Sequence, residues 1–215
     1  SSPKGAAMLP SRYFADLTQP EIAAQFKKHP LVILPTGSVE QHGPHLPTGT
    51  DTLAANVIAH DVAERMDGLV LPGTPLGVTP MHMPFEGTIT LTPDTYMRMV
   101  IETCSSTAKH GARALLVLNW HEGNIPSLAI AAEALHREHG MSVLTVQACY
   151  VAEELYGHSC GGFTPGGGME TLAGVAPRPG LGPVDCIAFS SWQRHGHKMC
   201  KPRTAGTHHA PLPAL

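Results

Sequence analysis

The chain has 215 residues, 42% of them hydrophobic, and a formal net charge of −3 at pH 7. This length suits one domain with a substantial core. A charge so close to balance gives no electrostatic reason to expect nucleic acid or an anionic membrane as a partner. The 14 histidines stand out against 5 phenylalanines and 4 tyrosines, and this surplus of imidazole favours metal chemistry.

The sequence also points to a compartment. No apolar run approaches the roughly 20 residues that a membrane span needs, and the first residues contain no hydrophobic stretch of the signal-peptide kind. The 5 cysteines are scattered and form no CxxC pair, which argues against a disulfide framework or a zinc knuckle. We therefore expect a cytoplasmic protein.

The first half of the chain alternates between short apolar segments and helical patterns. A short helix is predicted within residues 17–30, and a strand over 31–35, where "LVILP" has no polar alternation and so reads as covered on both faces. After a loop rich in glycine, proline and histidine, apolar spacing predicts a helix from 51 to 66, with Asp51 or Thr52 as its cap. A second short strand is expected within 68–73.

The alternation continues after a long loop at residues 74–91. Helices are predicted over 92–111 and 125–140, and strands over 113–120 and 141–150. Beyond residue 150 the pattern weakens. Glycine and proline dominate the stretch from 157 to 186, and no helix of ordinary length is predicted there.

This order of elements is typical of βαβ units around a parallel sheet. In such sheets ligands gather at the carboxyl ends of the strands. Two polar clusters follow strands in this way: residues 37–51 after the first, and "NWHEGN" (119–124) after the third. We expect the two loops to meet at one edge of the sheet.

The residue types in these loops are those of metal ligands. Glu40, His42 and Asp51 come from the first loop and His121 from the second. Carboxylate and imidazole together suit divalent ions such as zinc, manganese and ferrous iron. A carboxylate that bridges two ions would hold them roughly 3.5 Å apart with a shared hydroxide.

Four stretches resemble signatures of the creatininase (creatinine amidohydrolase) family. The segment "LPTGSVEQHGPHLPTGTD" matches the first signature nearly residue for residue, and "NWHEGN" is similar to the second. The segment "HMPFEGTITL" is similar to the loop before the family's second helix, and "PGGGMETL" is a partial match to a third signature. The resemblance covers about residues 10 to 175.

The resemblance implies an α/β fold: a three-layer α/β/α sandwich with a mainly parallel central sheet. It also implies two divalent metal ions per subunit (zinc, manganese or iron) and a homo-oligomer, commonly a hexamer built as a trimer of dimers. We expect a single creatininase-like domain over residues 1–215, in which 171–215 form a divergent tail rich in proline and histidine.

Carried over to this sequence, the resemblance assigns Glu40 and His121 to one metal, His42 to the other and Asp51 to both. One ligand stays open, because creatininase has a glutamate two residues after the signature histidine, where this chain has Gly123. Glu170 of the third signature is the preferred replacement, and Glu122 is the alternative.

The sequence also leaves more than one candidate for the residue that transfers protons during catalysis. Pro165 stands where the third signature has a histidine that is thought to assist proton transfer. His158, Glu122 and His82 are the candidates to replace it. For the substrate, Trp120 is bulky enough to stack on a flat molecule, and further candidate contacts are Asn124, Glu86 and Thr88.

The function that the resemblance implies is metal-dependent hydrolysis of a C–N bond. A hydroxide bridging the two metals would attack the carbonyl of a small, uncharged cyclic amide or a formamide-type substrate. Three alternatives stay open: deformylation of a pyrimidine nucleotide intermediate, trimming of a peptide in cofactor maturation, and a catalytically silent relative that retains the metal.

Overall fold

The structure is a computed structural model in which residues 9–160 are described. Within them, a parallel sheet has the strand order β2-β1-β3-β4. The strands are β1 (Leu31–Thr36), β2 (Leu69–Val70), β3 (Ala114–Asn119) and β4 (Ser142–Gln147). The helices are α1 (Gln19–Lys28), α2 (Thr50–Met66), α3 (Pro93–Lys109), α4 (Ile125–His139) and α5 (Ala148–Cys160).

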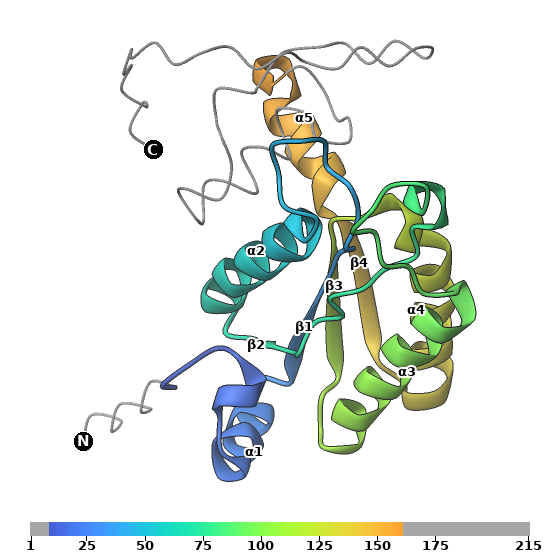
Figure 1. Ribbon diagram of the computed structural model, residues 1–215. Coiled ribbons are helices and arrows are strands. Elements are labelled where there is room, and N and C mark those ends of the chain that lie inside the picture. Colours follow the sequence, from blue (N-terminus) through green and yellow to red (C-terminus); the bar gives the residue numbers. More distant parts are fainter. Residues whose placement is uncertain (1–8, 161–215) are drawn as a thin grey trace, which may run out of the picture.

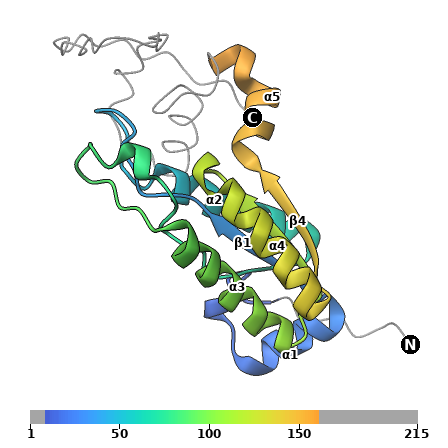
Figure 2. The same ribbon diagram turned by 90° about the vertical axis from the view of Figure 1, so that its right-hand side faces the viewer.

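Helices cover both faces of the sheet, which confirms the expected α/β class. Figure 1 shows α2 on one side of the strands and α3 and α4 on the other. In Figure 2, α3 and α4 run side by side over their face of the sheet. None of the described helices is both long and apolar enough to cross a membrane.

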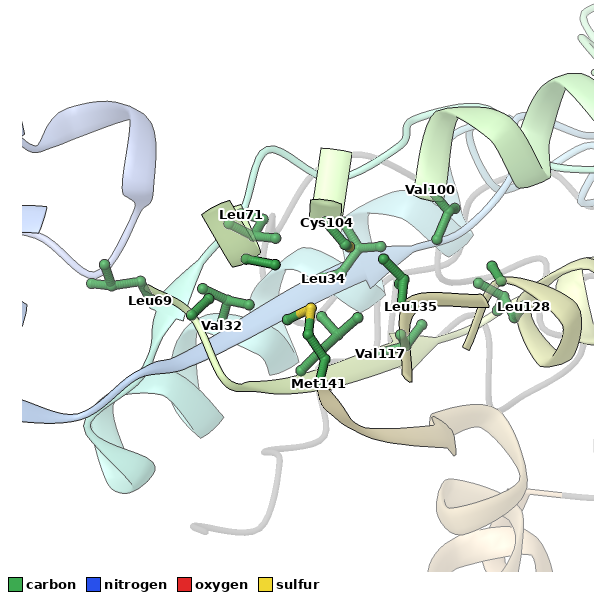
Figure 3. Packing of buried hydrophobic residues seen from close by; sticks show 14 of the residues in the cluster. Val32, Leu34, Leu69, Leu71, Val100, Cys104, Val117, Leu128, Leu135 and Met141 are labelled. Carbon is green, nitrogen blue, oxygen red and sulfur yellow. The ribbon is translucent and has the colours of Figure 1, made fainter. Parts of the chain in front are cut away.

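The two sides of β1 pack into different parts of the core because successive side chains of a strand point to opposite faces. Val32 and Leu34 lie in the cluster that α3 and α4 complete, which Figure 3 shows together with Leu128 and Leu135. Ile33 faces the other way, toward α2. On that side α2 contributes small side chains, which allow it to lie close to the sheet: Ala54, Ala55, Ala59 and Ala63.

Strand register brings the two polar loops to the same level. Strands β1 and β3 pair without a break from Leu31 opposite Ala114 to Thr36 opposite Asn119. At the last pair, the Thr36 hydroxyl donates a hydrogen bond of 2.7 Å to Asn119 Oδ1. The segments that follow Thr36 and Asn119 therefore leave the sheet next to each other, as predicted.

Two boundaries differ from the sequence-based expectation. Helix α2 begins at Thr50 with Gly49 at the cap position, so that Asp51 lies inside the first turn rather than at the cap. The predicted strand 141–150 ends at Gln147, and α5 begins at once. Residues 151–155, "VAEEL", are mostly good helix formers, and they extend a helix that the sequence reading had missed.

Several predictions fall outside what the structure describes. Glu170 and Pro165 belong to residues 161–215, as does the tail from 171 onward, and these residues lie outside the described part of the chain. His158 lies within α5, but its side chain is not described.

Candidate metal centre

Four ionisable side chains are buried at the carboxyl end of the sheet. Glu40, His42, Asp51 and His121 are between 1% and 6% exposed. Two of them sit in the loop after β1, one in the first turn of α2 and one directly after β3. Burying a carboxylate costs free energy unless the carboxylate is paired or binds a metal. The contacts of these four side chains should therefore show what compensates for that cost.

Three of these side chains converge on one point. His121 Nδ1 lies 3.4 Å from Glu40 Oε2 and 3.3 Å from Asp51 Oδ2. Glu40, Asp51 and His121 each offer one ligand atom, and these atoms all lie within 4.8 Å of one another. With metal–ligand bonds of about 2 Å, this spacing fits a divalent ion between them.

His42 approaches the same aspartate from its other oxygen. Its Nε2 lies 3.0 Å from Asp51 Oδ1, whereas His121 faces Oδ2. The Asp51 carboxylate therefore stands between two imidazoles, each on a different oxygen. This is the arrangement that a carboxylate bridging two ions requires.

The outer nitrogen of each histidine is held by a backbone carbonyl. His42 Nδ1 lies 3.0 Å from the Glu40 oxygen, and His121 Nε2 lies 3.0 Å from the Val78 oxygen. Because a carbonyl can only accept, these nitrogens carry the hydrogen and donate it. The tautomers so fixed leave His42 Nε2 and His121 Nδ1, which both face carboxylates, as the nitrogens able to bind a metal.

Hydroxyl groups support both carboxylates. Ser38 Oγ donates to Asp51 Oδ2 at 2.7 Å, and Thr79 Oγ1 donates to Glu40 Oε2. Neither the two hydroxyl donors nor the Val78 carbonyl is predicted from the sequence. Ser38 stands inside the first signature and could have been found there, whereas residues 78 and 79 lie in the connection from β2 to α3, outside the matched motifs.

The pKa values of Asp51 and His121 show that the cluster favours a positive charge next to Asp51. Burial raises the pKa of Asp51, but hydrogen bonds and charge interactions with His121 and His42 outweigh it and set the pKa at about 2. Burial lowers the pKa of His121, yet the hydrogen bond with Asp51 and the charges of Glu40 and Asp51 raise it overall. Asp51 therefore stays ionised, and its negative charge favours a cation at the point where a metal would lie.

Two asparagines fasten the loops that carry the ligands. The Asn119 amide donates to the His121 carbonyl at 2.6 Å. Asn124 Oδ1 accepts from the Val78 backbone N–H, and its Nδ2 donates to the Gly37 carbonyl, both at 2.9 Å. Asn124 is fully buried and joins three loops, and its predicted contact with substrate stays a prediction.

The remaining residues that were predicted to bind substrate or to take part in catalysis differ in their burial. Trp120 is only 2% exposed and packs in the core cluster between the sheet and α2, which leaves no open face for stacking on a substrate. Glu86 is exposed on the 74–91 connection, and Thr88 is buried there. Glu122 is exposed in the short 3-10 turn that follows His121.

His82, a predicted acid/base candidate, lies beside one of the candidate ligands. Its Nε2 lies 3.6 Å from Glu40 Oε1, and its Nδ1 lies 3.2 Å from Gln41 Nε2. It comes from the 3-10 turn Pro80–His82 of the 74–91 connection.

Comparison with known proteins agrees with this geometry. The creatininase (creatinine amidohydrolase) family model matches residues 15–210. A mycofactocin precursor peptide peptidase from Mycolicibacterium smegmatis is 36% identical over 115 residues, which cover 51% of this chain and 46% of that protein. A creatinine amidohydrolase from Pseudomonas putida is 33% identical over 123 residues, which cover 54% of this chain and 47% of that protein.

A solved structure, described as "Creatininase Mn", superimposes with a TM-score of 0.63 at 27% identity, covering 81% of this chain and 76% of that one. The sequence matches span about half the length of the two relatives. The family model, in contrast, extends over most of the chain, including the tail that the sequence reading treated as divergent. With the same fold and the first two signatures on one buried cluster, the chain belongs to the creatininase family.

Proposed function

We propose that this protein is a metal-dependent hydrolase that cleaves an amide C–N bond within a peptide. The observation that carries the proposal is the buried cluster in which Glu40, Asp51 and His121 offer ligand atoms within 4.8 Å of one another. The position of His42 on the opposite oxygen of Asp51 supports a second ion.

The ligand set suits two divalent ions, zinc, manganese or iron, because it mixes carboxylate oxygens with imidazole nitrogens. Glu40, His121 and Asp51 would hold one ion, and His42 and Asp51 would begin the shell of the other. Glu170 or Glu122 would add a further ligand. Such ions lower the pKa of a bound water toward neutrality and polarise a carbonyl oxygen.

The chain's own groups would supply the proton transfers and the substrate contacts. His82 faces Glu40 Oε1 from the edge of the site and is the described side chain best placed to move a proton to the leaving nitrogen. The roles of Glu122 and His158 in this step stay predictions.

A peptide substrate is favoured over a small cyclic amide for two reasons. First, the relative from Mycolicibacterium smegmatis is described as a peptide peptidase. Second, the connection that carries His82 exposes four large apolar side chains, each 40% to 59% accessible: Met81, Met83, Phe85 and Ile89. Exposed apolar groups next to a reactive site suit the side chains of a peptide better than a small polar ring.

The second candidate is hydrolysis of a small cyclic amide, which the likeness to a creatinine amidohydrolase supports. A deformylase and a silent metal-binding relative are the remaining alternatives. A cytoplasmic location and a hexamer also stay predictions.

The test is turnover by the full chain loaded with zinc, manganese or ferrous iron. Peptides with apolar side chains, creatinine and formylated compounds are incubated with the protein, and the products are identified by mass spectrometry. We expect cleavage of a peptide bond, and no cleavage by Asp51→Asn under the same conditions. Hydrolysis of creatinine alone would support the second candidate, and a fully metallated protein with no activity on any substrate would support the silent relative.

A further inference from the structure

Residues 74–91 of the connection between β2 and α3 contact the candidate metal centre, although they belong to neither of the two signature loops. At its base, the Leu91 N–H donates to the Gly77 carbonyl at 2.9 Å. The backbone N–H of Thr79 donates to Thr90 Oγ1 at 2.8 Å. Thr79 is thus held by the opposite arm of its own connection, and its side chain is completely buried.

From this fixed position, Thr79 contacts Glu40. Its hydroxyl donates to Glu40 Oε2, which is also the oxygen nearest to His121 Nδ1. A carboxylate oxygen accepts more than one bond, so the bond from Thr79 leaves acceptor capacity on Oε2 for a metal. Thr79 Oγ1 also lies 3.6 Å from Met81 Sδ, but a carboxylate oxygen is a much stronger acceptor than a thioether sulfur.

The residue before Thr79 contacts the other ligand of the same ion. The Val78 carbonyl accepts from His121 Nε2, so two consecutive residues of one connection hold Glu40 and His121. These two ligands follow different strands, which pair as far as Thr36 and Asn119. Val78 and Thr79 add a link between the two side chains that strand pairing alone does not supply.

We propose that Thr79 is a positioning residue for the metal centre: its hydroxyl sets the orientation of Glu40 toward His121. This inference rests on the proposed metal-dependent function. The physical reason is that a buried glutamate side chain has several rotamers, and only the one aimed at His121 completes the ligand set. A hydrogen bond to the charged carboxylate selects that rotamer before the metal arrives.

The experiment compares Thr79→Val with Thr79→Ser in the full chain. Valine keeps the shape of threonine and removes the hydroxyl, whereas serine keeps the hydroxyl. The affinity for Mn²⁺ and Zn²⁺ is measured by competition with a chromophoric chelator, and folding is checked by circular dichroism. We expect Thr79→Val to weaken metal binding about 10- to 100-fold, the range seen for groups that orient metal ligands. Thr79→Ser should bind close to the wild-type level.

The matched control is Thr74→Val. Thr74 is also buried in this connection, and none of its described contacts is with a metal ligand. The metal affinity of the Thr74→Val protein should equal that of the wild type. If Thr79→Val does not fold, Thr79→Ala replaces it in the same comparison.

The outcomes separate the inference from the function on which it rests. A wild-type protein that binds neither metal would contradict the proposed function itself. If the wild type binds metal and Thr79→Val binds it equally well, or Thr79→Ser binds as weakly as Thr79→Val, only the role of Thr79 is overturned.

Discussion

At Gly123 the backbone passes very close to its neighbours. A Cβ atom at this position would lie 2.1 Å from the Val78 oxygen and 2.6 Å from His121 Nε2. These are the two atoms that form the hydrogen bond holding the histidine tautomer. A residue with any side chain at 123 is therefore incompatible with this orientation of His121.

The substitution Gly123→Ala tests this packing. It should push His121 away from Val78 and weaken Zn²⁺ or Mn²⁺ binding by about 10- to 100-fold, because the ligand loses its orienting partner. Metal titration measures the effect. Gly49→Ala is the control, since an added Cβ there has nothing within 4 Å. Equal losses in the two variants would contradict the explanation.

The raised pKa of His121 predicts that metal binding depends on pH. Burial lowers this pKa, but the hydrogen bond with Asp51 and the charge of Glu40 raise it above the ordinary value of 6.5. When His121 is protonated, the added proton lies on Nδ1, between the carboxylates, and a metal must displace it. Metal affinity should therefore rise as the pH increases through neutrality, with release of about one proton from this histidine.

Calorimetric titration in two buffers of different ionisation enthalpy measures the released protons directly. The affinity is compared at about pH 6 and about pH 8, on either side of the ordinary histidine value. An affinity that does not change with pH, together with no proton release, would show that His121 is neutral before the metal binds.

Helix α2 ends in a residue that ties it to α1. Asp67, just after the helix, has a φ of 54°, a left-handed conformation that aspartate and asparagine tolerate. Its carboxylate lies 2.8 Å from both Arg12 and Lys28, and Gln25 donates to its carbonyl at 2.6 Å. This single position joins the first helix and the segment before it to the turn between α2 and β2.

The Asp67 contacts predict a stability difference at neutral pH that fades in acid. Hydrogen bonding to Lys28, then to Arg12, lowers the pKa of Asp67 from 3.8 to about 2. Its stabilising contribution is therefore complete above pH 3.8 and is lost as the pH falls toward about 2. Asp67→Asn keeps the backbone conformation and should lower the free energy of unfolding at pH 7 by less than about 1 kcal/mol for each partly exposed ion pair.

Urea unfolding of both proteins at several pH values checks this prediction. The difference between wild type and Asp67→Asn should shrink below pH 4, because the wild-type carboxylate becomes protonated first in the unfolded chain and then, near pH 2, in the folded protein. A difference that is constant from neutral pH to about pH 2 would assign the effect to the backbone turn instead.

On the scale of the whole molecule, the candidate metal centre joins segments that are far apart along the chain. Glu40 follows β1, Asp51 opens α2, His121 follows β3, and Thr79 reaches in from the connection after β2. An unfolded chain cannot present these groups together. Metal should therefore bind the folded state preferentially and stabilise the entire domain.

At a free metal concentration 100 times the dissociation constant, this linkage predicts about 2.7 kcal/mol of added stability. Urea unfolding with and without Mn²⁺ or Zn²⁺ measures the gain, and a chelator should abolish it. Asp51→Asn should show little response to metal. An equal response in this variant would place the bound ion elsewhere in the molecule.

The sequence by itself determined the layered α/β order and the four principal metal-ligand candidates. These follow from local patterns: uninterrupted apolar segments predict buried strands, and polar residues after parallel strands must share one edge of the sheet. The predicted boundaries differ from the structure at two places. At the start of α2, Asp51 suits a cap as well as the first turn of a helix, and at the start of α5 the residues after Gln147 suit a strand as well as a helix.

Only the tertiary structure decided how the candidates act. It placed Thr79 and Val78 against two candidate ligands, buried Trp120 and Asn124, and aimed particular histidine nitrogens at the carboxylates. The contacts of Thr79 with Glu40 and of Val78 with His121 join residues that are 39 and 43 positions apart. The other properties depend on contacts between separate loops or on packing against another layer. Local sequence sets which donors and acceptors are present, but the distances between them are fixed only when the sheet and its helices pack together.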